Sequence, residues 1–459
     1  MSIKSLFRQL SKNSVCLFRS RVSGLQKNTF LRKSALLSSG SAAGHFFTLI
    51  LSPILTRVYG PEDFATLGLF TSFLSVAGVA VTLQYETSII SASDQSEAVY
   101  LTLSAALLGI PTSLLAGCAM WFLIHNSLLG FGILPWYIPI LLSFVMCFVG
   151  CFAVLRYWCL RDQSFHTVSR AVAEQTAARV IAQAGAGLLG FHDVGLIAGE
   201  TLGRGVGLGR MFKSSWPEFH SHVTGFRWSE CRRVLWKNRK FPLLSLPSSF
   251  IDALCIGLTV PLLIQQYGSK IGGSYALVWR VLALPSVLIT LAVADTFHSQ
   301  IAEMVRQAPG KVMSFFTRTS MTLLLAGIVP SAILYLWGRP LFVLAFGAQW
   351  GVAGTLAALV APWYLGQLVV NPVSRTVLVL SGQETKLVWD VLCLVSLPVV
   401  FHIARERGLD VLGAVRLLSL VNTSLYFIYF LIVYRLIAKF HRSLIAPPLA
   451  GTVSEEVAG

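Results

Sequence analysis

Long apolar runs separated by short polar segments constrain this chain more than any other feature. A helix that crosses a bilayer needs about 20 consecutive apolar residues, and all of its backbone polar groups must be satisfied internally. The chain contains twelve candidate runs, at residues 35–57, 64–91, 97–124, 134–157, 166–189, 193–212, 241–264, 273–294, 313–337, 352–379, 387–403 and 410–434. Hydrophobic residues make up 55% and charged residues only 12%, which is not the balance of a soluble globular protein. The sequence therefore predicts an all-α membrane protein with about twelve transmembrane helices.

The basic residues between the runs predict the orientation in the membrane. Cytoplasmic loops of membrane proteins carry an excess of Lys and Arg. With a cytoplasmic N-terminus, few of the 36 Lys and Arg fall in segments predicted to lie outside, namely Arg57, Lys270, Arg339, Arg405 and Arg407. Both termini are therefore predicted to be cytoplasmic. This anchoring role accounts for the net charge of +16, and because no soluble segment alternates basic and aromatic residues, we expect no nucleic-acid partner.

A polar segment at residues 213–240 divides the runs into two sets of six. Its three Trp residues lie among Arg and Lys residues, which predicts a helix lying in the inner membrane interface. A shift of 208 residues aligns PILTRVYG at 53–60 with PLLIQQYG at 261–268, so the halves are predicted to be parallel repeats (6+6) around a central cavity. The predicted organisation is a basic cytoplasmic tail at 1–33, a six-helix lobe at 34–212, an amphipathic linker at 213–240, a second six-helix lobe at 241–438 and a cytoplasmic tail at 439–459.

Asp252 and Arg280 each lie near the middle of an apolar run. A charged side chain at that depth costs about 2.5–3.5 kcal/mol, so each is expected to face a cavity or a partner. At 1.5 Å per helical residue their depths differ by about 7 Å, which a long arginine side chain can bridge. An Asp252–Arg280 ion pair that only holds the seventh and eighth helices together is therefore one alternative for both residues.

The further charged candidates within apolar runs are Glu174, Arg179, Glu200 and Arg204, and Glu86 lies near the inner end of the second run. Glu200 and Arg204, four residues apart, share a helical face, which predicts an ion pair within one helix. Glu174 and Arg179, five apart, do not share a face, so each is expected to have its partner on another helix or in a cavity. Glu86 is either an interfacial residue or a cation or proton site.

The sequence indicates no cofactor and no metal site. GAGLLG at 185–190 matches the letters of a dinucleotide-binding loop, but no strand precedes it. The eight cysteines show no CxxC spacing, and no pattern typical of ATP binding or hydrolysis occurs. A coupling ion, H+ or Na+, is the one small partner left open, with Asp252, Glu86 and Glu174 as the carboxylates that would respond to it.

Several stretches together resemble a known family. They are LSPILTRVYGPEDFATLGLF (51–70), QYETSIISASDQSEA (84–98), RKFPLLSLPSSFIDAL (239–254), GGSYALVWRVLALP (272–285) and FGAQWGVAG (346–354). They are similar to bacterial polysaccharide and O-antigen repeat-unit flippases, the oligosaccharide flippase family within the multidrug/oligosaccharidyl-lipid/polysaccharide exporter superfamily. Gln84 and Ala65 depart from the family pattern, which often has Arg and Gly at those positions.

The resemblance implies a secondary-type transporter, not an enzyme, in the bacterial cytoplasmic (inner) membrane. Its cargo would be undecaprenyl-pyrophosphate-linked oligosaccharide units for lipopolysaccharide O-antigen or another surface polysaccharide. Membrane lipids, a polysaccharide polymerase and glycosyltransferases are the further partners it implies. Arginine binds phosphate oxygens in paired geometry, so the candidate substrate-binding residues are Arg280, Arg179 and Arg204. The candidate ion-coupling or counter-ion residues are Asp252, Glu86, Glu174 and Glu200.

Two alternatives use the same architecture. The first is a cation-coupled multidrug exporter, which needs an acidic, aromatic-lined site where a pyrophosphate carrier needs unpaired cationic groups. The second is a scaffold for a polymerase and glycosyltransferases that transports nothing.

Overall fold

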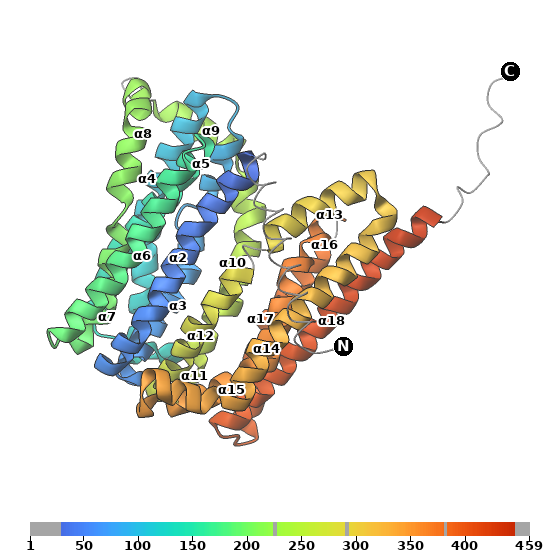
Figure 1. Cartoon of the computed structure of the whole chain (residues 1–459). Helices are drawn as coiled ribbons and strands as arrows, with labels where there is room; N and C mark the ends of the chain where they lie inside the picture. The colour runs from blue at the N-terminus through green and yellow to red at the C-terminus, as the bar shows by residue number, and fades with distance from the viewer. Residues whose placement is uncertain (1–28, 224–226, 290–292, 381–382, 446–459) are drawn as a thin grey trace.

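The computed structural model describes residues 29–223, 227–289, 293–380 and 383–445, and these ranges contain helices and turns but no strands (Figure 1). Most of the predicted tails at 1–33 and 439–459 lies outside the described residues. Within these ranges, eight helices are long and apolar enough to cross a membrane. The described part of each predicted run falls mainly on one helix or on consecutive helices. The predicted all-α membrane fold is therefore confirmed.

The first half of the chain contains α2 (Thr29–Val58), α3 (Pro61–Ala80), η1 (Tyr85–Ser91), α4 (Gln95–His125), η2 (Leu128–Ile133), α5 (Ile138–Arg161), α6 (Phe165–Leu188), α7 (His192–Gly205), α8 (Leu208–Val223) and α9 (Trp228–Lys237). The predicted run 64–91 is wrong as a single helix. Leu83 and Gln84 have φ values of 52° and 63°, a left-handed backbone that an α-helix cannot contain. The chain therefore turns after α3, and Glu86 lies in the short 3-10 helix η1.

The second half contains η3 (Phe241–Ser245), α10 (Leu246–Gly257), α11 (Thr259–Tyr267), α12 (Ser269–Ile289), α13 (Asp295–Gln307), η5 (Pro309–Lys311), α14 (Val312–Phe346), η6 (Ala348–Trp350), α15 (Gly351–Ser374), α16 (Thr376–Val379), α17 (Gln383–Glu406) and α18 (Val411–Ile445). The predicted run 241–264 is divided among η3, α10 and α11, and it contains three prolines. A proline inside a helix removes one hydrogen bond and bends the axis, which accounts for the division.

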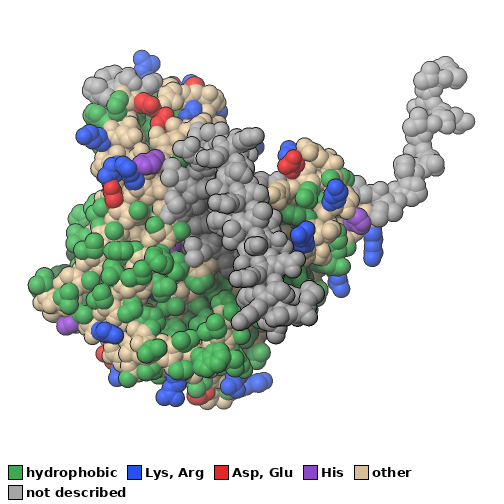
Figure 2. Space-filling model, viewed as in Figure 1, with side chains coloured by type: hydrophobic (Ala, Val, Ile, Leu, Met, Phe, Trp, Pro, Cys, Tyr) green, Lys and Arg blue, Asp and Glu red, His purple; other side chains and the backbone are tan. Residues whose placement is uncertain are grey.

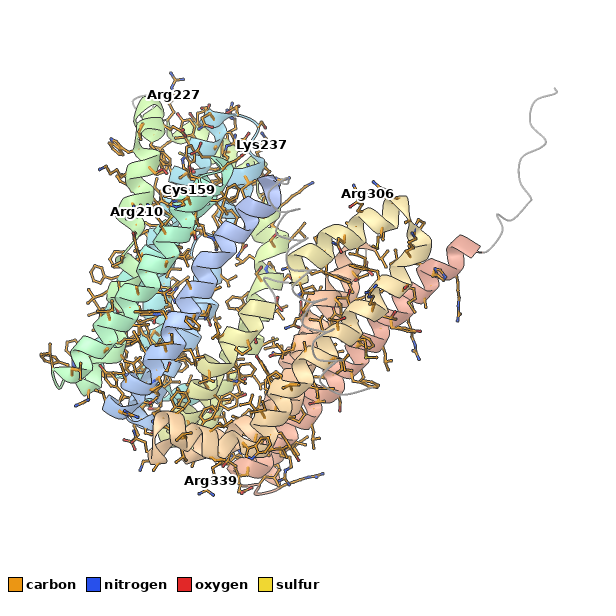
Figure 3. All side chains as sticks on the ribbon, in the orientation of Figure 1. Cys159, Arg210, Arg227, Lys237, Arg306 and Arg339 are labelled. Atoms are coloured by element: carbon orange, nitrogen blue, oxygen red, sulfur yellow. The ribbon has the colours of Figure 1, made fainter. Side chains whose placement is uncertain are left out.

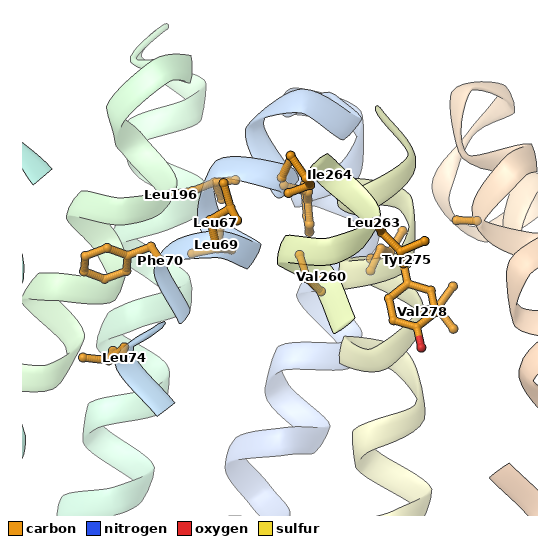
Figure 4. Packing of buried hydrophobic residues seen from close by; sticks show 14 of the residues in the cluster. Leu67, Leu69, Phe70, Leu74, Leu196, Val260, Leu263, Ile264, Tyr275 and Val278 are labelled. Carbon is orange, nitrogen blue, oxygen red and sulfur yellow. The ribbon is translucent and has the colours of Figure 1, made fainter. Parts of the chain in front are cut away.

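The helices form two groups that meet at one end of the molecule. In Figure 1, α2–α9 form one group, α13–α18 lean away as a second, and α10 lies between them. Buried apolar side chains of α3, α11 and α12 form a shared core, in which Leu69, Leu263 and Val278 have no exposed surface (Figure 4). At Gly273 of α12 a Cβ would overlap the carbonyl oxygen of Pro61. Glycine therefore allows α12 to pack directly against the start of α3.

A second contact closes the molecule near α11 and the start of α15. The Gln349 side chain and the Trp350 indole N–H both donate to the Thr56 carbonyl of α2, at 2.7 and 3.0 Å. The Trp350 ring also meets the Phe64 ring edge-on, with centroids 5.0 Å apart. Segments nearly 300 residues apart in sequence are thus joined at this end.

The outer surface suits a membrane. Large apolar side chains are exposed on the long helices, among them Leu115, Phe144, Leu336 and Val388, and Figure 2 shows hydrophobic side chains covering much of one face. Basic side chains lie towards the ends, where Figure 3 labels Arg227 and Lys237 at one end and Arg339 at the other.

The segment predicted to lie in the interface contains α9 and most of α8. Trp228 and Trp236 of α9 are 70% and 69% exposed, and the Arg239 guanidinium lies 4.4 Å from the Trp236 ring centroid. Lys237 pairs with Glu97 at 2.8 Å, which attaches α9 to the start of α4. Exposed indoles among basic side chains are typical of a membrane interface.

Candidate functional site

A cavity of about 970 Å³ lies between the two groups of helices. Its walls come from α2, α3, α6, α7, α10, α11, α12, α15, α17 and α18. The charged side chains that line it are Arg179, Arg204, Arg280, Arg375 and Lys386, together with Glu200, Asp252 and Asp390. The described lining therefore has two more basic than acidic groups. A chamber with an excess of basic side chains can hold an anionic group that hydrocarbon would exclude.

Glu200 joins two of the arginines on the α6–α7 side. Its buried carboxylate lies 2.9 Å from Arg204 on the same helix and 3.7 Å from Arg179 on α6. At Gly203 a Cβ would overlap the Cβ of Arg179, so the small residue lets α6 and α7 approach closely. The predicted pair within α7 is confirmed, and so is the expectation that Arg179 finds its partner on another helix.

Arg280 reaches the cavity from α12 without a carboxylate partner among the described residues. Its Nη2 donates to the side-chain oxygen of Gln183 at 3.2 Å, and its guanidinium carbon lies 5.8 Å from the Phe64 ring centroid. Its Nε is buried and has no hydrogen-bond partner in the described part of the chain. The direct contacts of Arg280 are thus with neutral groups, while Arg179 and Glu200 act on it at longer range.

Asp252 pairs with a different residue from the one predicted. Lys386 of α17 lies 3.3 Å from Asp252 and 2.6 Å from Asp390, so one ammonium bridges two carboxylates. The alternative of an Asp252–Arg280 ion pair is therefore wrong for this conformation. Similar depth along two helix axes does not fix the direction in which each side chain points around its axis. Asp252 contacts Lys386 of α17, whereas Arg280 contacts Gln183 of α6.

The other two predicted carboxylates lie outside this cavity. Glu174 accepts two hydrogen bonds from Arg210 of α8, at 2.5 and 3.0 Å, in an exposed pair. Its predicted partner on another helix is thereby found. Glu86 is buried, accepts a hydrogen bond from the Thr82 hydroxyl, and lines a smaller cavity of about 250 Å³. Arg204 lines both cavities, which places Glu86 near the arginine cluster without direct contact.

Sequence reasoning missed several lining or supporting residues: Gln183, Trp279, Trp363, Lys386 and Asp390. Lys386 stands one position before the predicted run 387–403, where the sequence predicts a loop. The spacing of four between Lys386 and Asp390 is a signal that could have revealed the pair. Gln183 is a polar amide inside an apolar run, and such a residue in a spanning helix usually has a partner on a neighbouring helix.

The comparisons with known proteins give fold similarity without a sequence relative. A scan against protein-family models and a search of curated protein sequences returned no match. Among solved structures, the lipid II flippase MurJ in an inward closed conformation superposes with a TM-score of 0.67 at 14% identity, covering 89% of this chain and 91% of that one.

Two further solved structures are similar. An inward-facing multidrug resistance MATE family transporter of the MOP superfamily gives a TM-score of 0.62 at 14% identity, covering 89% of this chain and 96% of that one. A MOP superfamily transporter from Pyrococcus furiosus, described as having a binding pocket of reversed polarity, gives 0.59 at 14% identity with the same coverage. The chain therefore has the fold of these proteins, which are transporters and a flippase rather than enzymes.

Proposed function

We propose that this protein is a flippase that translocates undecaprenyl-pyrophosphate-linked oligosaccharide repeat units from the inner to the outer leaflet. The observation that carries the proposal is the cationic cavity, in which Arg280 has no carboxylate partner in the described chain. Guanidinium stays charged and donates to phosphate oxygens in paired geometry. A sugar headgroup can be sheltered in the cavity while the polyprenyl chain stays in lipid.

The proposal places the protein in the bacterial cytoplasmic membrane with both termini in the cytoplasm. The end held together by Gln349, Trp350 and Thr56 then faces outwards, and the substrate enters from the cytoplasmic side. A polysaccharide polymerase and glycosyltransferases are the partners that such a pathway requires. Arg179 and Arg204 assist Arg280, with Glu200 setting their geometry.

We further propose that a coupling ion, H+ or Na+, drives transport of the substrate in one direction. The bridged carboxylates Asp252 and Asp390 are the groups in the cavity that would respond to it, because a ligand shifts a conformational equilibrium only by binding the two states differently. Flipping in proteoliposomes should then depend on a proton or sodium gradient. A flipping rate that is the same with and without either gradient would exclude ion coupling.

A cation-coupled multidrug exporter is the second candidate. The observation that favours it is the side of the cavity formed by Asp252, Asp390 and Trp389, since a lipophilic cation needs carboxylates and aromatic faces. Lys386 bridges those carboxylates, so a drug cation would first have to displace it. This is why the flippase is proposed first.

The test is flipping of a fluorescent prenyl-pyrophosphate glycan in proteoliposomes, read as protection from an impermeant quencher. Arg280→Ala should lower the rate at least tenfold at an unchanged protein level. Arg280→Lys should keep part of the rate, because ammonium lacks the planar fork. Arg339→Ala, an exposed arginine outside the cavity, is the matched control. Normal flipping by Arg280→Ala would end the proposal, and efflux of cationic dyes without glycan flipping would favour the exporter.

A further inference from the structure

Gln183 is a fully buried side chain where α6, α7 and α12 meet the end of α2. It lies on α6, and its backbone carbonyl accepts a hydrogen bond from the hydroxyl of Tyr59, the residue that follows α2, at 2.8 Å. Its side-chain NH2 donates to the Leu196 carbonyl of α7 at 3.0 Å. Its side-chain oxygen accepts from Arg280 of α12 at 3.2 Å. One residue thus connects the helices that carry the arginine cluster with the helix that carries Arg280.

The two partners of the Gln183 amide determine its orientation. A backbone carbonyl can only accept a hydrogen bond, and a guanidinium can only donate. The NH2 group must therefore face Leu196 and the oxygen must face Arg280. A carboxylate at this position would meet the Leu196 carbonyl with a second acceptor, and an apolar side chain would provide neither bond.

The neutrality of Gln183 distinguishes Arg280 from the other arginines. Arg179 and Arg204 share the Glu200 carboxylate, which offsets part of their charge. Arg280 is oriented by an amide, so its positive charge is not cancelled by its anchor. Its buried Nε, like that of Arg179, has no hydrogen-bond partner in the described chain, so the anchor and not the unpaired Nε is what sets Arg280 apart.

We propose that Gln183 is a positioning residue that sets specificity for a doubly phosphorylated headgroup, by holding Arg280 towards the cavity with its charge intact. The inference rests on the proposed function, because it assigns the neighbour that prepares Arg280 for pyrophosphate. A carboxylate at position 183 would act as an internal competitor for the arginine. An apolar residue there would leave Arg280 free to turn away from the cavity.

The experiment measures binding of geranylgeranyl diphosphate and geranylgeranyl monophosphate to the purified full-length protein in nanodiscs. The wild type should prefer the diphosphate, and inorganic pyrophosphate should compete with it, which separates recognition of the phosphates from recognition of the prenyl chain. Gln183→Glu should weaken diphosphate binding at least tenfold and abolish the preference. Gln183→Met should reduce the preference by removing the anchor without adding charge.

Gln175→Glu is the matched control, because it adds the same charge to α6 at a residue whose side chain bonds the Arg204 backbone and not Arg280. The Gln175→Glu variant should keep the diphosphate preference. If it loses that preference, the effect is due to added charge at a distance, and the role of Gln183 is overturned. A wild type that binds neither lipid would instead overturn the proposed function. If Gln183→Glu folds and still prefers the diphosphate as strongly as the wild type, the inference is overturned. If Gln183→Glu does not fold, the same result in Gln183→Met overturns it.

Discussion

Individual charges in this protein are distinguished by the partner that each one has. The buried Glu200 carboxylate lies between two arginines, and Lys386 lies between two aspartates. Arg280, in contrast, is hydrogen-bonded to an amide. A buried charge without a counter-charge is costly. Arg280 makes no ion pair in the described chain, and the Glu200 carboxylate, already shared by Arg179 and Arg204, acts on it only at longer range. This is the reason for proposing the substrate contact at Arg280.

Removing Glu200 should destabilise the protein more than removing Glu174. Glu200→Ala leaves Arg179 and Arg204 close together without their shared counter-ion, at a cost of about 3 kcal/mol. The exposed Glu174–Arg210 pair should contribute about 0–1 kcal/mol. Thermal unfolding in detergent measures both, and equal melting temperatures for Glu200→Ala and Glu174→Ala would contradict the assignment.

A double-mutant cycle should show Asp252 coupled to Lys386 and independent of Arg280. Residues in direct contact show interaction energies of roughly 0.5–3 kcal/mol, whereas independent residues add within about 0.5 kcal/mol. Asp252→Asn combined with Lys386→Met should therefore be less damaging than the sum of the single changes. Asp252→Asn combined with Arg280→Ala should be additive in thermal stability. Coupling between Asp252 and Arg280, with additivity between Asp252 and Lys386, would instead support an Asp252–Arg280 ion pair.

At the scale of helices, the breaks and close approaches position the cavity. The chain turns between α3 and η1 and again among η3, α10 and α11, while the contact at Gly273 holds α12 against α3. Broken helices are tolerated in membranes only where their backbone is buried in protein or lines a polar cavity. The division of 241–267 next to the cavity agrees with that requirement.

The contact between Thr56 and the start of α15 should act as the closure of the cavity at that end. Trp350→Phe combined with Gln349→Ala removes both donors to the Thr56 carbonyl while keeping a ring against Phe64. Spin labels on the exposed Arg57 and Arg339 report the separation of α2 and α14 at this end. The double variant should show a longer distance population than the wild type, and an identical distance distribution would exclude a gating role.

At the scale of the whole molecule, the two helix groups meet at one end and separate at the other (Figure 1). If the end near Thr56 faces outwards, this conformation receives substrate from the cytoplasm. Transport then requires the contacts at Thr56 to break and new ones to form at the opposite end, as alternating access describes.

Cysteine labelling in intact cells tests this orientation. In a background without native cysteines, Lys270→Cys should react with an impermeant maleimide, because the exposed start of α12 is predicted to lie outside. Arg232→Cys of α9 should react only after permeabilisation. Reaction at Arg232→Cys in intact cells, with none at Lys270→Cys, would reverse the proposed topology.

The sequence by itself determined the class of fold and many of the charged candidates. Apolar runs long enough to span a bilayer predict helices, because a helix satisfies all of its backbone hydrogen bonds within one segment when water is absent. The spacing of four between Glu200 and Arg204 predicted their pair, because helical geometry places such residues on one face. The charge of Arg280 inside a run predicted a functional location, because charges are expensive there.

Only the tertiary structure decided which charges meet across helices. Depth along a helix follows from residue number at 1.5 Å per residue, but direction around the axis depends on packing and on breaks such as those at Leu83 and after Gly257. Asp252 therefore paired with Lys386, more than a hundred positions away, and not with Arg280. Gln183 is identified as the anchor of Arg280 only from the packing of α6, α7 and α12. An amide can both donate and accept hydrogen bonds, so the residue type alone does not say which partners it has.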